Sequence, residues 1–145
     1  ASRSGVWLFR ALRELGHERA WVVHGLAGLD EITSAADTLV AELRDGTVSQ
    51  FTLRPEDLGL PRCTLEDLKG GDAATNAAAL RDLLHGRKGA LRDTVLMTSA
   101  AALVIAGKVG DLKEGLVLAA QAIDGGAALG KLDALVAATN APAAP

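Results

Sequence analysis

The dipeptide Asp45-Gly46 separates two strand-like segments of equal length, 38–44 and 47–53. A two-residue Asp-Gly loop between such segments favours a β-hairpin, because both central residues of the tight turn need positive φ angles. On the second segment Val48 alternates with its polar neighbours, although the alternation is not clean. The sequence therefore predicts a hairpin centred on Asp45-Gly46.

A short apolar run, 20–24, precedes this hairpin and ends at Gly25. Its lack of alternation is typical of a strand buried on both faces, as in a parallel sheet. Before it, apolar residues recur at three- and four-residue steps over 5–15, which predicts an amphipathic helix ended by Gly16. We therefore expect an α/β fold with a partial mixed sheet, made of a parallel strand plus the hairpin.

After Pro55 the sequence pattern changes from strand-like to helical segments, and a cluster of about four helices is expected. Polar residues that suit helix N-caps precede the apolar segments. The segment 94–106 is apolar nearly all round, so we expect it to be central. The expected N-caps are Thr64, Asp72, Asp93 and Asp111, and the expected helices begin near Thr64 and then span 72–84, 94–106, 111–123 and 127–138.

One helix and one strand before the hairpin cannot complete a doubly wound sheet, so we expect further strands upstream of Ala1. The chain has 145 residues, begins with alanine, and has Met97 as its only methionine, which also suggests a partial chain. We expect residues 1–139 to belong to one α/β domain. The Ala/Pro tail 140–145 is expected to be flexible.

Composition excludes several partners and sites. The net charge of −3 and an aromatic content of 3% argue against a nucleic-acid surface and against attraction to anionic membranes. Cys63 is the only cysteine, so an intramolecular disulfide is impossible, which fits a reducing compartment such as the cytoplasm. No signal peptide or membrane-spanning run is evident.

The acidic pair Asp30-Glu31 is the best candidate for chemistry. It follows a glycine-punctuated loop just beyond the strand 20–24, and ligands in open α/β sheets gather beyond the carboxyl ends of strands. Magnesium prefers one or two carboxylates together with waters and phosphate oxygens. From spacing alone, a solvated acidic turn remains the alternative to a metal site.

Other polar residues receive structural interpretations. Gly70-Gly71-Asp72 is typical of an anion cradle or of a helix cap, and the negative charge of Asp72 favours the cap. His24 ends the strand, where a hydrogen-bonded structural histidine is commoner than a general base. Cys63 has neither a histidine nor a basic helix terminus beside it in the sequence, so a nucleophilic role is not expected. We assign no catalytic residue and no substrate-binding residue.

Six ordered segments together resemble the C-terminal part of anthranilate phosphoribosyltransferases. Each is weak alone, but their order is specific, and the resemblance extends from the first helix to about Leu135. The segments are Val22-Val23-His24-Gly25, Gly28-Leu29-Asp30-Glu31-Ile32, Thr38-x-Val40-x-Glu42-Leu43, Pro55-Glu56-Asp57-x-Gly59-Leu60, Gly70-Gly71-Asp72-Ala73-x-x-Asn76-Ala77 and Gly89-x-x-Arg92-Asp93-x-Val95-Leu96.

The resemblance implies the C-terminal part of a nucleoside phosphorylase/phosphoribosyltransferase-type α/β domain. It also implies transfer of the phosphoribosyl group of phosphoribosyl pyrophosphate to anthranilate in tryptophan biosynthesis, by a cytoplasmic homodimer. Asp30 and Glu31 would then bind Mg²⁺. The family's pyrophosphate loop and anthranilate-binding arginine lie upstream of this part, so we expect the isolated piece to be inactive.

Several positions depart from the family pattern and leave alternatives open. Ala27 stands where an acid is frequent, Ala36 and Asp37 replace glycine and proline, Ala90 replaces proline, and Thr98 replaces asparagine. These changes affect loop geometry more than fold. The alternatives are a non-catalytic scaffold or interaction module derived from the family, and a pyrimidine nucleoside phosphorylase-like enzyme.

Overall fold

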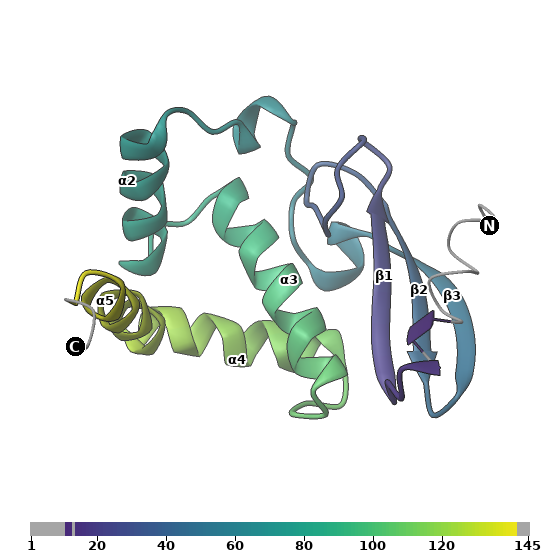
Figure 1. The fold of residues 1–145 in the computed structure, drawn as a ribbon. Helices are drawn as coiled ribbons and strands as arrows, with labels where there is room; N and C mark the ends of the chain where they lie inside the picture. Colours follow the sequence, from purple (N-terminus) through teal and green to yellow (C-terminus); the bar gives the residue numbers. More distant parts are fainter. Residues whose placement is uncertain (1–10, 13, 142–145) are drawn as a thin grey trace.

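The computed structural model describes residues 11, 12 and 14–141 of the chain. Within them, a three-stranded sheet lies at one end and four α-helices extend from it toward the other (Figure 1). Most of the helix expected over 5–15 lies outside the described residues, although 11, 12 and 14 are helical. Residues 142–145 of the expected flexible tail also lie outside them. The α/β class is confirmed.

The sheet has the order β1-β2-β3, with β1 at Arg19–Gly25, β2 at Thr38–Arg44 and β3 at Thr47–Leu53. The hairpin between β2 and β3 is confirmed at both boundaries. Asp45 and Gly46 have φ angles of 49° and 77°, the positive values that a tight two-residue turn requires. Asp45 is the only described non-glycine residue with positive φ. The turn that it forms with Gly46 sets the register between β2 and β3.

The parallel strand that we expected is not found among the described residues. β1 pairs antiparallel with β2 over its full length, from Arg19 opposite Arg44 to Gly25 opposite Thr38. Trp21 and its valine neighbours are only partly buried, and His24 is exposed. An apolar run does not encode strand direction. The connection does, and residues 26–37 form a returning loop instead of the crossover helix that a parallel pair usually needs.

The four α-helices are α2 at Ala73–Leu84, α3 at Ala90–Ile105, α4 at Leu112–Asp124 and α5 at Ala127–Thr139. Two of the expected caps are confirmed. The Asp72 carboxylate accepts from the backbone N–H of Thr75 at 2.8 Å, and that of Asp111 accepts from Glu114 at 2.9 Å. None of the described helices is both long enough and apolar enough to span a bilayer.

The start predicted for α3 is wrong. The helix begins at Ala90, and Gly89, with a φ angle of 140°, occupies its N-cap position, so Asp93 lies inside the first turn instead of capping it. Glycine adopts such a backbone at little cost, which lets the chain enter the helix earlier than the acid suggested. Partial burial raises the pKa of the Asp93 carboxyl.

The helix expected near Thr64 is only a short 3-10 turn. The reciprocal bonds of a capping box do form, because Thr64 N–H donates to the Asp67 carboxylate at 2.8 Å and Asp67 N–H donates to the Thr64 hydroxyl at 3.3 Å. They enclose the 3-10 helix η2, Glu66–Leu68, while the 3-10 helix η1 spans Pro55–Leu58. Lys69 has an extended backbone, which stops the turn before α-helical bonding begins.

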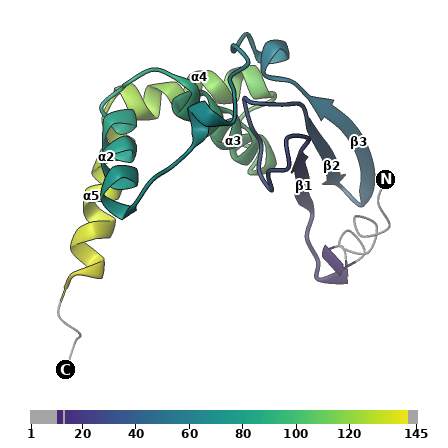
Figure 2. The same ribbon diagram turned by 90° about the horizontal axis from the view of Figure 1, so that it is seen from above.

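The core has two parts joined by α3, and the expectation that this helix is central is confirmed. Figures 1 and 2 show α3 between the sheet and the helices α2 and α5. Met97 and Ala101 pack toward the sheet, whereas Leu96 packs toward the other helices. The buried partners on the sheet side are Ile32, Val40 and Leu53, and those on the helical side are Leu83, Ala119 and Ile123.

Candidate functional site

The loop 26–37 connects β1 to β2 and is closed on itself at its beginning. Gly25 N–H donates to the carbonyl of Leu29 at 2.9 Å, and Gly28 N–H donates back to the carbonyl of Gly25 at 2.9 Å. Gly28 has a φ angle of 91°, which an L side chain rarely adopts. The loop therefore makes a tight turn before it reaches its acidic pair.

Asp30 and Glu31 are exposed and lie directly after this turn. Neither side chain forms a hydrogen bond or an ion pair with a residue that the structure describes. The backbone on both sides is fixed, because Leu29 is bonded to Gly25 and Ile32 is 3% exposed in the core. Two free carboxylates are thus presented to solvent from an ordered loop.

Gly25 allows the loop to pass close to the strand. A Cβ atom at this position would lie 3.1 Å from the carbonyl oxygen of Glu31, 3.2 Å from Cγ2 of Thr33 and 3.3 Å from Cβ of Leu29. Real Cβ contacts are rarely that short, so a larger residue would push the acidic segment outward. The glycine is needed for space at this position.

Buried hydroxyl groups fix the far side of the loop. Ser34 is fully buried, and its hydroxyl lies 2.8 Å from that of Thr94 on α3. Ser34 N–H also donates to the Thr94 hydroxyl at 3.3 Å, and Cys63 N–H donates to the Ser34 carbonyl at 3.1 Å. The Ser34 hydroxyl also lies 3.1 Å from the sulfur of Cys63, within hydrogen-bond distance.

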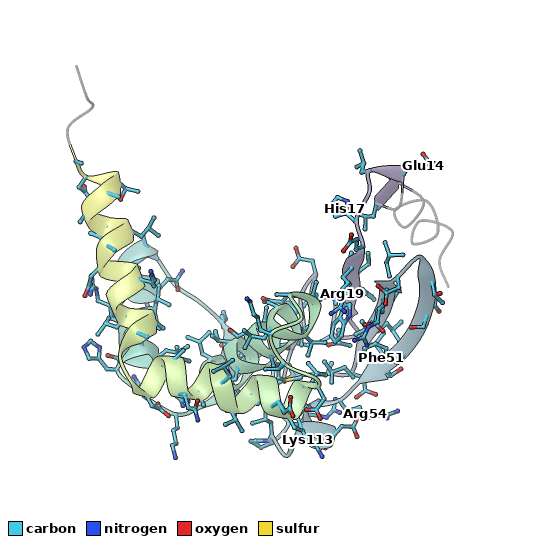
Figure 3. All side chains as sticks on the ribbon, turned by 90° about the horizontal axis from the view of Figure 1, so that it is seen from below. Glu14, His17, Arg19, Phe51, Arg54 and Lys113 are labelled. Carbon is cyan, nitrogen blue, oxygen red and sulfur yellow. The ribbon has the colours of Figure 1, made fainter. Side chains whose placement is uncertain are left out.

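An ionic cluster fixes the end of the loop. The Arg62 guanidinium donates to the Asp37 carboxylate at 2.6 Å and to the Glu56 carboxylate at 2.7 Å, while Arg54 donates to Asp37 at 3.2 Å. These hydrogen bonds from Arg62 lower the pKa of both carboxyls, with smaller help at Asp37 from Arg54. Figure 3 shows Arg54 just beyond the end of β3. Asp37, a departure from the family pattern, therefore has a defined ionic role.

A separate cavity of about 500 Å³ lies between α2, α3 and the turn after η2. Four basic side chains line it, but three are paired: Lys69 with Glu66 at 3.1 Å, Arg87 with Asp82 at 2.8 Å and Arg92 with Asp124 at 2.9 Å. Neither Asp30 nor Glu31 borders it. The cavity and the acidic pair are therefore distinct features of the structure.

The other polar residues considered from the sequence do not form a second candidate site within the described residues. The amide of Asn76 bonds both backbone groups of Gly71, at 2.8 and 3.1 Å, so the glycine pair before α2 belongs to a helix cap as expected. His24 is exposed, and its imidazole forms no hydrogen bond within the described residues, so the side-chain bonding expected for it is not found. Arg92 on α3 forms an ion pair with Asp124 at the end of α4 and so connects these two helices.

The acidic pair fits a hard divalent cation only with help from outside the described residues. Within these, no group of three or more His, Cys, Asp or Glu side chains could hold a metal ion. Two exposed carboxylates are nevertheless the usual protein contribution to a Mg²⁺ site, in which waters and substrate phosphates complete the octahedron. The donor chemistry therefore suits Mg²⁺ bound together with a phosphate-bearing ligand.

Sequence reasoning identified the acids but missed the groups that hold them. Ser34 and Thr94 are far apart in sequence, and nothing in their local pattern indicates that they meet. Arg62 was also missed, because a lone arginine in a loop usually indicates a solvated side chain. A contact between residues so distant in sequence becomes visible only in the folded chain.

Three comparisons place the chain among known proteins. Residues 6–129 match the glycosyl transferase family, a/b domain. An anthranilate phosphoribosyltransferase from Parvibaculum lavamentivorans is 58% identical over 130 residues, which is 90% of this chain and 38% of the relative. The crystal structure of an anthranilate phosphoribosyltransferase from Thermus thermophilus matches with a TM-score of 0.83 and 39% identity, covering 94% of this chain and 40% of that one.

A second similar structure was solved with ligands. It is an anthranilate phosphoribosyltransferase from Saccharomyces cerevisiae in complex with PRPP and Mg, with a TM-score of 0.77 and 25% identity. It covers 88% of this chain and 37% of the yeast chain. The chain thus spans about 38% of the length of the Parvibaculum lavamentivorans relative, and it covers a similar share of the length of the two solved structures.

Proposed function

Since it matches the a/b domain over residues 6–129, this chain belongs to the glycosyl transferase family, and we propose that it forms part of an anthranilate phosphoribosyltransferase. Its contribution is the loop with Asp30 and Glu31. The observation that supports this role most directly is the exposure of both carboxylates, without a partner among the described residues, on a backbone fixed at Leu29 and Ile32. Acidic residues in an ordinary solvated turn do not require a fixed backbone on both sides.

The proposed reaction transfers the phosphoribosyl group of phosphoribosyl pyrophosphate to the amino group of anthranilate. A bound Mg²⁺ supplies positive charge that offsets the charge developing on the leaving pyrophosphate. Asp30 and Glu31 would hold that ion through their carboxylate oxygens. The fixed loop keeps these oxygens in place, which matters because such a transfer depends on positioning and charge stabilisation more than on covalent help.

The rest of the site is proposed to come from chain that this sequence does not include. That part would provide the pyrophosphate loop, the anthranilate contacts and the strands that extend the sheet beyond β1. We also propose that the complete enzyme is a cytoplasmic homodimer and that residues 1–139 form one part of its α/β domain. On its own, the present chain is expected to bind Mg²⁺ weakly and to be inactive.

A chimaera tests the proposal. The chain replaces the matching region of the Parvibaculum lavamentivorans enzyme, and loss of anthranilate is followed with phosphoribosyl pyrophosphate and Mg²⁺ present. We expect activity within about tenfold of the parent enzyme and a loss of at least about a hundredfold in the Asp30→Asn, Glu31→Gln double variant. Asp45→Asn in the hairpin turn is the matched control and should retain activity.

The other outcomes are informative as well. A folded chimaera without activity would overturn the proposal and favour a non-catalytic scaffold, for which Ala27 and Thr98 would then be the first residues to examine. Activity that survives the double substitution would leave the family role intact but remove the assignment of the metal to Asp30 and Glu31.

A further inference from the structure

We propose that the buried hydroxyl pair of Ser34 and Thr94 is a positioning device for the acidic loop. This inference rests on the proposed function, because it assigns the pair the task of holding Asp30 and Glu31 where a cation can be bound. The pair touches neither the ion nor a substrate. It acts through the backbone of the loop.

The pair belongs to a buried polar network. The Ser34 hydroxyl lies within hydrogen-bond distance of the Thr94 hydroxyl, the Cys63 sulfur and the carbonyl of Ala90, at 2.8, 3.1 and 3.4 Å. Ser34 is fully buried and Thr94 is 6% exposed. A buried polar group that loses its hydrogen-bond partner costs free energy. The loop conformation in which all of these bonds form is therefore favoured over conformations that break one of them.

The network connects the loop to the most central helix of the fold. Thr94 lies near the start of α3, and the core residues of that helix pack against the sheet from which the loop emerges. The loop is therefore fixed twice, by the Gly25–Leu29 backbone bond before the acids and by Ser34 after them. Asp30 and Glu31 lie in the short segment between these two points.

The hydroxyl groups of Thr33 and Thr38 hold the loop backbone as well. The hydroxyl of Thr33 accepts from the N–H of Ala35 at 3.0 Å, and Thr33 N–H donates to the hydroxyl of Thr38 at 3.4 Å. Thr33 and Thr38 are fully buried. The backbone after Glu31 thus enters a dry, hydrogen-bonded turn at once, and any slip at Ser34 would be transmitted to the carboxylates.

The geometry of the cation makes such slips matter. Mg²⁺ needs near-octahedral oxygens at roughly 2.0–2.1 Å, so carboxylate displacements on the order of an ångström weaken its binding. Burial of Ile32 in the core holds the backbone next to Glu31, but apolar packing is not directional. Hydrogen bonds from fixed donors and acceptors supply that precision, because they are directional.

The test uses substitutions at Thr94 that separate the hydroxyl from the shape of the side chain. Thr94→Val keeps the shape and removes the hydroxyl, whereas Thr94→Ser keeps the hydroxyl. Thr52→Val is the matched control, because Thr52 is partly buried on β3 and its hydroxyl bonds to no described residue. Two quantities are measured on the chain itself: the affinity for Mn²⁺ by electron paramagnetic resonance, and amide hydrogen exchange across residues 26–37.

We expect Thr94→Val to weaken Mn²⁺ binding about tenfold and to speed exchange in the loop by a similar factor, as the loss of a buried hydrogen bond implies. Thr94→Ser should restore both to within about twofold of the unsubstituted chain. Thr52→Val should change neither. If Thr94→Val fails to fold, Ser34→Ala provides the same comparison.

The results distinguish this inference from the proposed function. If the unsubstituted chain binds Mn²⁺ through Asp30 but Thr94→Val binds it equally well with unchanged loop exchange, the positioning role is wrong and the metal site stands. If Asp30→Asn leaves Mn²⁺ binding unaltered, the metal assignment fails and this inference fails with it. If the unsubstituted chain binds no Mn²⁺, the same variants are compared in the chimaera with phosphoribosyl pyrophosphate present, and absence of binding there is the result that overturns both.

Discussion

A methyl group added at Gly115 should fail to stabilise the chain, although the same change at an exposed position in a helix stabilises it. Gly115 is buried where α4 crosses α3. A Cβ atom there would lie 2.8 Å from Cα, 2.9 Å from Cβ and 3.0 Å from the carbonyl oxygen of Ala100. These atoms belong to the helix backbone or are attached directly to it, so they cannot rotate away.

Gly130 provides a matched control. Both glycines are the fourth residue of a 13-residue helix, but Gly130 in α5 is exposed and a Cβ there would meet nothing within 4 Å. Replacing a helical glycine by alanine is worth about 1 kcal/mol of helix propensity. Because that gain applies to both variants, the difference between them isolates the crowding at Ala100.

Overpacking a well-filled interface costs about 1–3 kcal/mol. Gly130→Ala should therefore raise the free energy of unfolding by about 1 kcal/mol. Gly115→Ala should leave it unchanged or lower it by up to about 2 kcal/mol. Urea unfolding followed by circular dichroism measures both, and the midpoint of thermal unfolding should differ by several degrees between the variants. Equal gains from Gly115→Ala and Gly130→Ala would refute the close approach of α3 and α4.

Two further predictions concern a cap and an ionic cluster. Asp111→Ala should cost about 1 kcal/mol by removing the N-cap of α4, and Asp111→Ser should recover most of it in the same urea assay. The pKa values of Asp37 and Glu56 are lowered in the fold, so their contribution to stability is present at neutral pH and lost as the pH falls through about 4 and below. Arg62→Gln should flatten that acid-side decline, and an unchanged profile of unfolding free energy between about pH 6 and pH 3 would contradict the role of Arg62.

The elements that sequence reasoning placed correctly depend on local chemistry. The Asp45-Gly46 hairpin requires two residues that tolerate positive φ, and the caps at Asp72 and Asp111 require one carboxylate and the N–H group three residues later. Each signal is complete within a few residues. The sequence alone is therefore sufficient to predict them.

The failures concern information that is distant in sequence or that the pattern does not contain. The direction of β1 depends on the route of the loop 26–37, and an apolar run is compatible with either direction. The early start of α3 depends on the backbone freedom of Gly89, whereas Asp93 offered a more familiar cap signal. Both errors arose from choosing a common local pattern over an alternative that tertiary packing favours.

For the candidate site, the residues alone gave only the acidic pair and left its role open. The resemblance to a family supplied the metal interpretation for Asp30 and Glu31. The groups that hold the loop, Ser34 with Thr94 and Arg62 with Asp37, became apparent only from the folded chain. Hydroxyl and ionic contacts between distant segments leave no periodic signal, so single-sequence reasoning cannot place them.

The most direct test of the account is to locate a bound divalent cation on the chain by paramagnetic broadening of amide resonances with Mn²⁺. If Asp30 and Glu31 hold the ion, broadening should be centred on the amides of residues 29–32, should be competed by Mg²⁺, and should be abolished when both acids are replaced by their amides. Broadening centred on other acids, such as Asp82 or Asp133, with the loop unaffected, would contradict the account.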